Sequence, residues 1–206
     1  MSRSLYDTSG DRRLIALIDR TLLDAGQRAG AHLACRIGCT ECCIGPFPIT
    51  QLDALRLRAG LTELQRADPA RAEGIVLRAR AAVDLMRAQF PGDPATGIFG
   101  EDEEAEEAFC SAFADVRCPA LDPATGRCEL YTARPISCRT YGPPVKIGDE
   151  ALPPCRLCFT QAAPAEIEGA RVEIDPDDRE GALLRDLEAR GRSGETTVAH
   201  ALALGT

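Results

Sequence analysis

Apolar side chains recur at intervals of three and four residues along residues 11–29. This spacing matches the period of an α-helix with one apolar face, so the sequence predicts an amphipathic helix here. The face that we expect to be buried consists of Leu14, Ile18, Leu22, Ala25 and Ala29.

Two further helices are predicted next. Thr50 has the side chain that an N-cap needs, and Gly60 is expected to end the helix that Thr50 begins. The third helix is expected to begin after Asp68, which is followed by a proline, and to stop at Pro91. Its expected apolar stripe is Ala72, Val76, Ala79, Val83, Met86 and Phe90.

The rest of the chain shows weaker patterns. Residues 91–100 are predicted to form a loop, and the acidic run at 101–107 is expected to lead a short helix that carries Phe109 and Phe113. Beyond the cysteine-rich part, the expected elements are a strand at 170–174, a helix at 177–190 and a short apolar segment at 198–204.

The span from 118 to 158 has little apolar periodicity and is dense in proline, glycine and cysteine. We therefore predict a mainly α fold with an irregular, loop-rich core organised by metal-binding cysteines, and small β content at most. We expect a single domain over residues 1–206, with an N-terminal helix in 1–34, a cysteine-cluster region in 35–160 and a C-terminal segment in 161–206.

A five-residue string, DPATG, occurs twice, at 93–97 and at 122–126. It is typical of a type I turn, because aspartate and proline favour the first two positions and glycine favours the end. We interpret both copies as turn chemistry rather than as a structural repeat. The second copy is expected to bring Cys118 and Cys128 together.

Composition and charge narrow the classes of function. The 206-residue chain has a formal net charge of −8, which argues against a nucleic-acid partner, since phosphate contacts need a basic face. We see no targeting segment and no apolar run long enough to span a membrane. We therefore expect a cytoplasmic protein without a membrane partner, in which the ten cysteines stay reduced.

Cysteines in a reducing compartment are typical of metal sites rather than of a disulfide framework. They fall in a compact first group, in which short spacing lets a turn aim several thiolates at one centre, and in a more dispersed second group. The eight cysteines that we expect to bind metal are Cys35, Cys39, Cys42, Cys43, Cys118, Cys128, Cys138 and Cys155.

The identity of the metal is argued from the adjacent pair Cys42 and Cys43. Neighbouring side chains diverge on a helix or a strand, so the pair is expected to fit two corners of an iron–sulfur cluster more easily than one tetrahedral zinc ion. We therefore favour an iron–sulfur cofactor, such as a [4Fe–4S] cluster, with zinc as the alternative. One cluster together with one zinc ion also stays open.

The cysteine pattern, together with the residues around it, resembles the YkgJ family of cysteine-cluster proteins, also called CxxCxxCC zinc- or iron-chelating proteins. The first spacing here is three residues where the family name has two. The resemblance covers residues 35 to about 158 and depends on Cys35, Cys39, Cys42, Cys43, Cys118, Gly126, Cys128, Tyr131, Arg134, Pro135, Cys138, Arg139, Tyr141, Gly142 and Cys155.

This resemblance implies metal chelation and leaves the biological role open. Many members are called iron–sulfur oxidoreductases, and a related member is a flagellin lysine N-methylase. Three classes of function therefore compete: a metal-binding protein with a redox role and a redox partner, a metal-dependent protein-modifying enzyme similar to the methylase, and a structural zinc protein that docks on another protein. No glycine-rich loop that would bind a methyl-donor nucleotide is present in the sequence.

Several residues have two interpretations. Arg134, Arg139 and Tyr141 are candidates for a cofactor or anion pocket beside the metal, although we favour arginines that neutralise thiolates or bond loop carbonyls. Cys158 is a ninth ligand, a redox thiol or a packing residue, and His32 is a ligand or a surface residue. Two side chains are expected to lack a metal-binding role, namely Cys110, as a buried inert thiol, and His200 in the tail.

Overall fold

The computed structural model describes residues 8–36 and 38–204. Residues 1–7, 37 and 205–206, which belong to the predicted N-terminal, cysteine-cluster and C-terminal segments, lie outside the described residues. Within the described part the fold is mainly helical, with eight α-helices and two small sheets, as predicted. None of its helices is both long enough and apolar enough to cross a membrane.

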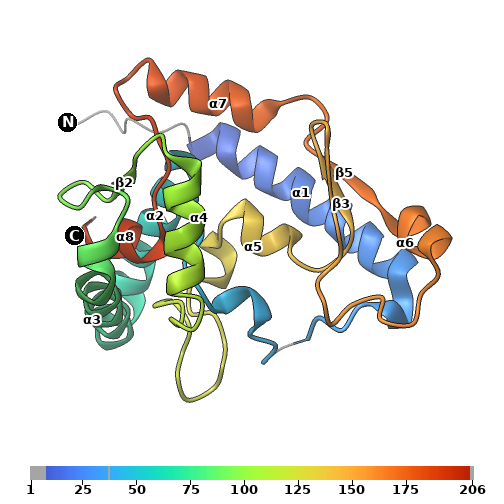
Figure 1. The fold of residues 1–206 in the computed structure, drawn as a ribbon, viewed down its shortest axis with the longest axis horizontal. Helices are drawn as coiled ribbons and strands as arrows, with labels where there is room; N and C mark the ends of the chain where they lie inside the picture. Colours follow the sequence, from blue (N-terminus) through green and yellow to red (C-terminus); the bar gives the residue numbers. More distant parts are fainter. Residues whose placement is uncertain (1–7, 37, 205–206) are drawn as a thin grey trace. The chain divides into compact units, whose positions relative to one another are not determined.

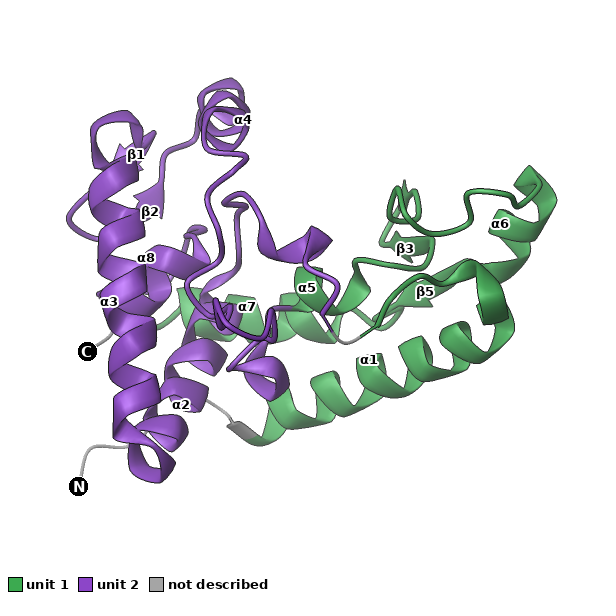
Figure 2. Ribbon diagram, turned by 90° about the horizontal axis from the view of Figure 1, so that it is seen from below, with its two compact units in different colours: residues 1–36, 136–191 green, residues 37–135, 192–206 purple. Residues whose placement is uncertain are grey.

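The chain divides into two compact units, shown in green and purple in Figure 2. Unit 1 contains residues 1–36 and 136–191, and unit 2 contains residues 37–135 and 192–206. The chain therefore passes from one unit to the other three times, and the predicted cysteine-cluster region at 35–160 contributes to both.

Unit 1 is built on the long helix α1 (Thr8–Ala29), which lies against the other helices of the unit and against its sheet. Leu14, Ile18, Ala25 and Ala29 of the predicted apolar face are buried, and Leu22 is half-buried. The other helices are α5 (Ile136–Thr140), α6 (Pro164–Ala170) and α7 (Arg179–Glu188).

A three-stranded sheet completes unit 1, in the order β4 (Glu150–Leu152), β3 (Val145–Ile147), β5 (Val172–Ile174). Strand β5 confirms the strand predicted at 170–174, and it pairs in parallel with β3. The hairpin of β3 and β4 lies in the span for which the sequence predicts an irregular, loop-rich structure with small β content. Its turn begins at Ile147 and passes through Gly148, whose φ of 57° lies in the left-handed region that glycine adopts without strain.

The core of unit 2 is formed by three helices that pack together, α2 (Gln51–Ala67), α3 (Pro69–Met86) and α8 (Val198–Ala203) (Figure 1). The predicted caps are confirmed, because the Thr50 and Asp68 side chains accept hydrogen bonds from backbone N–H groups three residues later. The predicted apolar segment at 198–204 is helix α8, which is buried throughout.

Two details of these helices differ from the sequence prediction. Helix α2 continues through Gly60 to Ala67, because Gly60 is a packing position rather than a helix end. A Cβ atom at Gly60 would lie 2.4 Å from the Cβ of Ala133, so glycine is needed for the close approach of the 3₁₀ turn Tyr131–Ala133. Helix α3 ends at Met86, and Ile75 rather than Val76 is fully buried on its apolar face.

Phenylalanines cluster at one end of the unit 2 core. Phe90, Phe99 and Phe109 have ring centroids 4.9–5.8 Å apart, and the ring of His200 lies 4.4 Å from that of Phe90. The predicted loop at 91–100 contains a small hairpin of β1 (Gly92–Asp93) and β2 (Ile98–Phe99), and the predicted acidic helix is α4 (Glu103–Ala112). These rings supply bulk to a core that is otherwise rich in alanine.

Candidate metal centre

The first cysteine group ends in a 3₁₀ turn, Glu41–Cys43, within unit 2. The N–H of Cys43 donates to the carbonyl of Thr40 over 2.9 Å and closes this turn. The Sγ atoms of Cys42 and Cys43 lie 4.0 Å apart. The two adjacent side chains therefore approach each other here, whereas the sequence argument expected them to diverge.

The segment after this turn pairs with the segment that leads to Cys118. The N–H of Cys118 donates to the carbonyl of Cys43, and the N–H of Gly45 donates to the carbonyl of Val116, each over 2.8 Å. An isolated bridge joins Ile44 to Arg117. The backbone thus places Cys118 beside Cys43, although 75 positions separate them in the sequence.

Cys118 and Cys128 stand on the two legs of a hairpin whose turn is the second DPATG string. We call residues 118–129 the cysteine hairpin. An isolated bridge between Leu121 and Cys128 joins its legs, and the N–H of Asp122 donates to the carbonyl of Arg127 over 2.8 Å. The sequence prediction that this turn brings the two cysteines together is consistent with these contacts.

Four thiols of unit 2 influence one another electrostatically, and we call them the thiol quartet: Cys42, Cys43, Cys118 and Cys128. The hydrogen bond from the Cys43 thiol lowers the pKa of Cys42 to about 7, and the same bond together with burial raises the pKa of Cys43. Burial raises the pKa of Cys118 to about 12, and neighbouring thiols add to this effect.

Arg134 is a cation that acts on two thiols of the quartet. Its positive charge lowers the pKa of Cys42, and it opposes the rise in the pKa of Cys128 that burial causes. The guanidinium lies 4.0 Å from the centre of the Tyr131 ring, in a cation–π contact. Arg134 therefore fits the interpretation that we favoured, an arginine that offsets thiolate charge.

Other predicted ligands belong to unit 1, where Cys35 and Cys155 are neighbours through Gly142. The N–H of Cys155 donates to the carbonyl of Gly142 over 3.0 Å, and a Cβ atom at Gly142 would lie 2.8 Å from Sγ of Cys35. Cys138 is half-buried on helix α5. Cys39 belongs to unit 2.

Two of the residues with two interpretations, Arg139 and Cys158, are buried. Arg139 is buried and donates to the carboxylate of Asp19 over 2.6 Å, which ties helix α5 to helix α1. Cys158 is 4% exposed in an apolar cluster, and its Sγ accepts the N–H of Ala34 over 3.4 Å.

The remaining candidates are on or near the surface. Tyr141 is about half exposed. His32 stacks on Phe159 and lies 3.9 Å from the Glu166 carboxylate, as expected for a surface residue. Cys110 is half-buried against the phenylalanine-rich core, which raises its pKa by desolvation.

Sequence reasoning missed Arg78 and Glu129, whose ion pair holds the cysteine hairpin against α3. Arg78 of α3 donates to the carbonyl of Pro119 over 2.9 Å and also to the carboxylate of Glu129. Because 41 and 51 positions separate these partners, no local pattern in the sequence indicates the contact.

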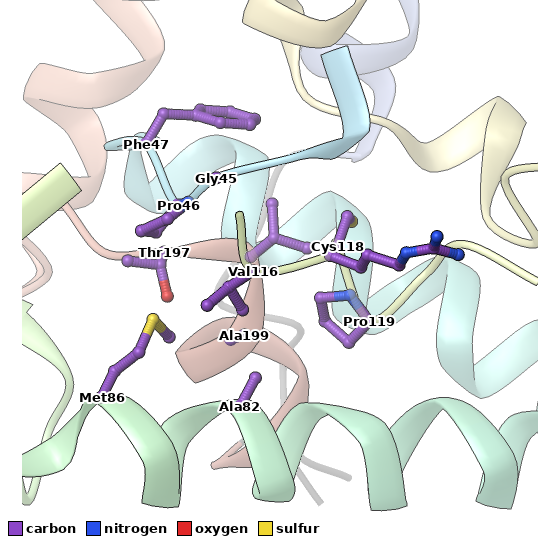
Figure 3. A pocket seen from close by; sticks show the side chains of 12 residues that line it. Gly45, Pro46, Phe47, Ala82, Met86, Val116, Cys118, Pro119, Thr197 and Ala199 are labelled. Carbon is purple, nitrogen blue, oxygen red and sulfur yellow. The ribbon is translucent and has the colours of Figure 1, made fainter. Parts of the chain in front are cut away.

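A cleft with mainly apolar walls borders the quartet at Cys118 (Figure 3). Met86 and Ala82 of α3 line it on one side, and Phe47 and Val116 lie above them in the view of Figure 3. The cleft gives Cys118 apolar surroundings, in keeping with the burial that raises the pKa of its thiol.

The quartet fits a thiophilic metal by its chemistry. Within residues 8–36 and 38–204, no three Cys, His, Asp or Glu side chains already stand together in the arrangement of a metal coordination shell, and no disulfide joins the cysteines. The pairing of thiols at 4.0 Å and the mutual pKa effects nevertheless mark a site where several thiolates would repel unless a cation neutralised them. Soft sulfur donors select zinc or iron and not magnesium or calcium.

Comparison with known proteins gives one match. Residues 34–158 match the family model "CxxCxxCC: Putative zinc- or iron-chelating domain". No curated protein and no solved structure matches the chain. The matched residues cover more than half of the chain and contain the whole quartet together with Cys35, Cys39, Cys138 and Cys155. The chain therefore belongs to the CxxCxxCC family.

Proposed function

We propose that this protein binds zinc or iron through thiolates, and that the quartet of Cys42, Cys43, Cys118 and Cys128 holds one metal centre. The observation that carries the proposal is the convergence of two segments distant in the sequence on four mutually interacting thiols. A bound cation would stabilise the thiolates and tie the first cysteine group to the cysteine hairpin.

The 4.0 Å separation of the Cys42 and Cys43 sulfur atoms favours one ion shared by both. In a tetrahedral site with metal–sulfur bonds of about 2.3 Å, neighbouring sulfur atoms are about 3.8 Å apart. The pair thus no longer supports the sequence argument for an iron–sulfur cluster over zinc. We place a single zinc ion first in the quartet, and an iron–sulfur cluster with a redox role second.

Arg134 has a defined part in this site. Four thiolates around a divalent cation leave two negative charges, and a nearby guanidinium lowers the cost of keeping them partly buried. The Tyr131 ring contacts that guanidinium. Metal binding also displaces the protons that Cys43 and Cys118 hold at neutral pH, so the chain should release protons when the metal binds.

The test is metal and sulfide analysis of anaerobically purified protein, combined with cysteine variants. We expect bound zinc without acid-labile sulfide, and a large loss of zinc in Cys43→Ser and Cys118→Ser. Cys110→Ser should retain the metal, because Cys110 lies outside the quartet. Iron with stoichiometric sulfide would instead establish the cluster, and retention of metal in all quartet variants would refute the quartet as the site.

The same experiment assigns the remaining predicted ligands. If Cys35, Cys138 and Cys155 of unit 1 bind a second centre, their replacement by serine should remove part of the metal and leave the part held by the quartet. Cys39→Ser tests in the same way whether the centre in unit 2 also needs this cysteine of the first group. The cytoplasmic location and any protein partner remain predictions from the sequence.

A further inference from the structure

One arginine of α3 is bonded to both legs of the cysteine hairpin. The Nε of Arg78 donates to the carbonyl of Pro119 over 2.9 Å, and its Nη2 donates to the carboxylate of Glu129. Pro119 directly follows Cys118, and Glu129 directly follows Cys128. A single planar guanidinium therefore connects the two residues adjacent to two thiols of the quartet.

The carboxylate of Glu129 is shared with a second arginine. The Nε of Arg71 donates to Oε1 of Glu129 over 3.0 Å, while Nη2 of Arg78 donates to Oε2. The Glu129 side chain is only 7% exposed, so its charge is stabilised by these two partners rather than by water. The backbone N–H of Glu129 also donates to the carbonyl of Ala120 across the hairpin, over 2.8 Å.

Helix α3 provides a firm base for this contact. Ile75 and Ala79, on either side of Arg78, are fully buried in the core of unit 2. Gly74 leaves room for the guanidinium, since a Cβ atom there would lie 3.2 Å from Nη1 of Arg78. The Arg78 side chain is thus anchored in the helix at its base, and its guanidinium is held by two acceptors on the hairpin.

We propose that Arg78 is a positioning residue of the metal centre: it holds Cys118 and Cys128 at a fixed separation before the metal binds, with Glu129 as its partner and Arg71 in support. This inference rests on the proposed function of the quartet. Arg78 acts through the backbone next to the ligands and does not touch the metal. Because one half of the site is already ordered, metal binding needs to fix fewer residues and costs less conformational entropy.

The test uses Co²⁺ as a spectroscopic probe of the reduced protein. In Arg78→Gln we expect the affinity for Co²⁺ and Zn²⁺ to fall about 10- to 100-fold, the usual effect of losing an outer partner of a metal ligand. The absorption bands of thiolate-bound Co²⁺ should also shift, because they report the arrangement of the ligands. Arg78→Lys keeps the charge but reaches one acceptor, so its loss should be intermediate.

Two comparisons separate positioning from general damage. Arg87, which directly follows α3, forms an exposed ion pair with Asp84. Arg87→Gln removes this pair and should leave the metal affinity and the Co²⁺ spectrum unchanged. Glu129→Gln should weaken metal binding. The double variant Arg78→Gln with Glu129→Gln should lose less binding free energy than the sum of the two single losses, because both changes remove the same ion pair. If Arg78→Gln does not fold, Arg78→Lys and Glu129→Gln carry the test.

Hydrogen exchange of the metal-free protein tests the inference without the metal. Arg78→Gln should speed exchange of the Glu129 N–H and its hairpin neighbours, and leave α8 protected. Wild-type affinity, spectrum and exchange in Arg78→Gln, Arg78→Lys and Glu129→Gln would overturn the inference. If the wild-type protein binds neither Co²⁺ nor Zn²⁺ but Arg78→Gln still speeds exchange, the proposed zinc site is refuted and Arg78 is left as the residue that holds the hairpin.

Discussion

His200 shows how one buried side chain can make the stability of unit 2 depend on pH. It is 1% exposed, and its Nδ1 lies 2.9 Å from the hydroxyl of Thr197, which also caps α8 by accepting the N–H of His200. That hydroxyl and Nδ1 therefore share a hydrogen bond, and the tautomer of the imidazole sets which of them donates. Within the described residues the Nε2 atom has no hydrogen-bond partner.

We predict that unit 2 loses stability as the pH falls from about 6.5 to about 4. Burial, helped by the charge of Arg87, lowers the pKa of His200 from 6.5 to about 4. The unfolded chain therefore binds a proton before the folded chain does, so the stabilisation is complete above pH 6.5 and is lost as the pH falls toward 4. The shift corresponds to about 3.5 kcal/mol at most, at about 1.4 kcal/mol per pH unit.

Urea unfolding of the metal-free, reduced protein at pH 7 and pH 4.5 measures this effect, since acid would otherwise also release metal. His200→Leu should be less stable at pH 7 but should lose less stability between the two pH values. His32→Gln, at the half-exposed surface histidine of unit 1, should keep the wild-type difference. An equal pH-dependent loss in His200→Leu would show that other groups cause it.

At the level of elements, the two DPATG strings form the same turn. In each, aspartate accepts from the backbone N–H two residues on and from the threonine hydroxyl, and the glycine N–H returns to the aspartate carbonyl. The glycines have φ values of 69° and 67°. The turn at 93–97 joins β1 to β2, whereas the turn at 122–126 closes the cysteine hairpin.

These matched turns give a controlled prediction. Asp122→Ala and Asp93→Ala remove the same hydrogen bonds, so both should slightly lower thermal stability. Only Asp122→Ala should weaken metal binding, by about tenfold, because it loosens the hairpin that carries Cys118 and Cys128. Competition with a metal-sensitive dye measures the affinities, and equal effects of the two changes would exclude a specific role for this turn.

Elements that depend on neighbouring residues could be predicted from the sequence, and those that depend on distant partners could not. The caps at Thr50 and Asp68, the face of α1 and the DPATG turns follow from local spacing and side-chain chemistry. The role of Gly60 was misjudged because its reason is Ala133, far along the chain.

The same distinction holds at the candidate site. That the candidate site is made of cysteines is visible in the sequence, because cysteine spacing and the softness of sulfur ligands are local properties, and which of the cysteines bind metal stays a prediction. The approach of Cys42 to Cys43 depends on a 3₁₀ turn that the spacing did not reveal. The ion pair of Arg78 with Glu129 joins residues 51 positions apart. The passage of the chain from one unit to the other has no local signal in the sequence.

At the scale of the whole molecule, the cysteines are divided between two units that each have buried apolar residues of their own. In unit 2 the quartet lies on turns and bridges around a core of α2, α3 and α8, in which Leu57, Ile75 and Leu202 are at most 1% exposed. The irregular span at 118–158, which the sequence predicts to be organised by metal-binding cysteines, is therefore divided as well. Residues 118–135 belong to unit 2, and residues 136–158 belong to unit 1.

We predict that a strong chelator, added under reducing conditions, loosens the metal-binding turns before the helical core. Hydrogen exchange should quicken in residues 39–45 and 116–130, which depend on few hydrogen bonds and lose the cation that joins their sulfur atoms, while α2, α3 and α8 stay protected by buried apolar contacts. Faster exchange in residues 136–158 as well would show that Cys138 and Cys155 of unit 1 also bind metal.

At a metal concentration of about 1,000 times Kd, binding adds about 4 kcal/mol to the free energy of unfolding, so the chelated protein should also unfold at a lower urea concentration. Unchanged exchange in 39–45 and 116–130 after metal analysis has verified the loss would contradict the prediction, because the two segments would then not need a cation to hold them together.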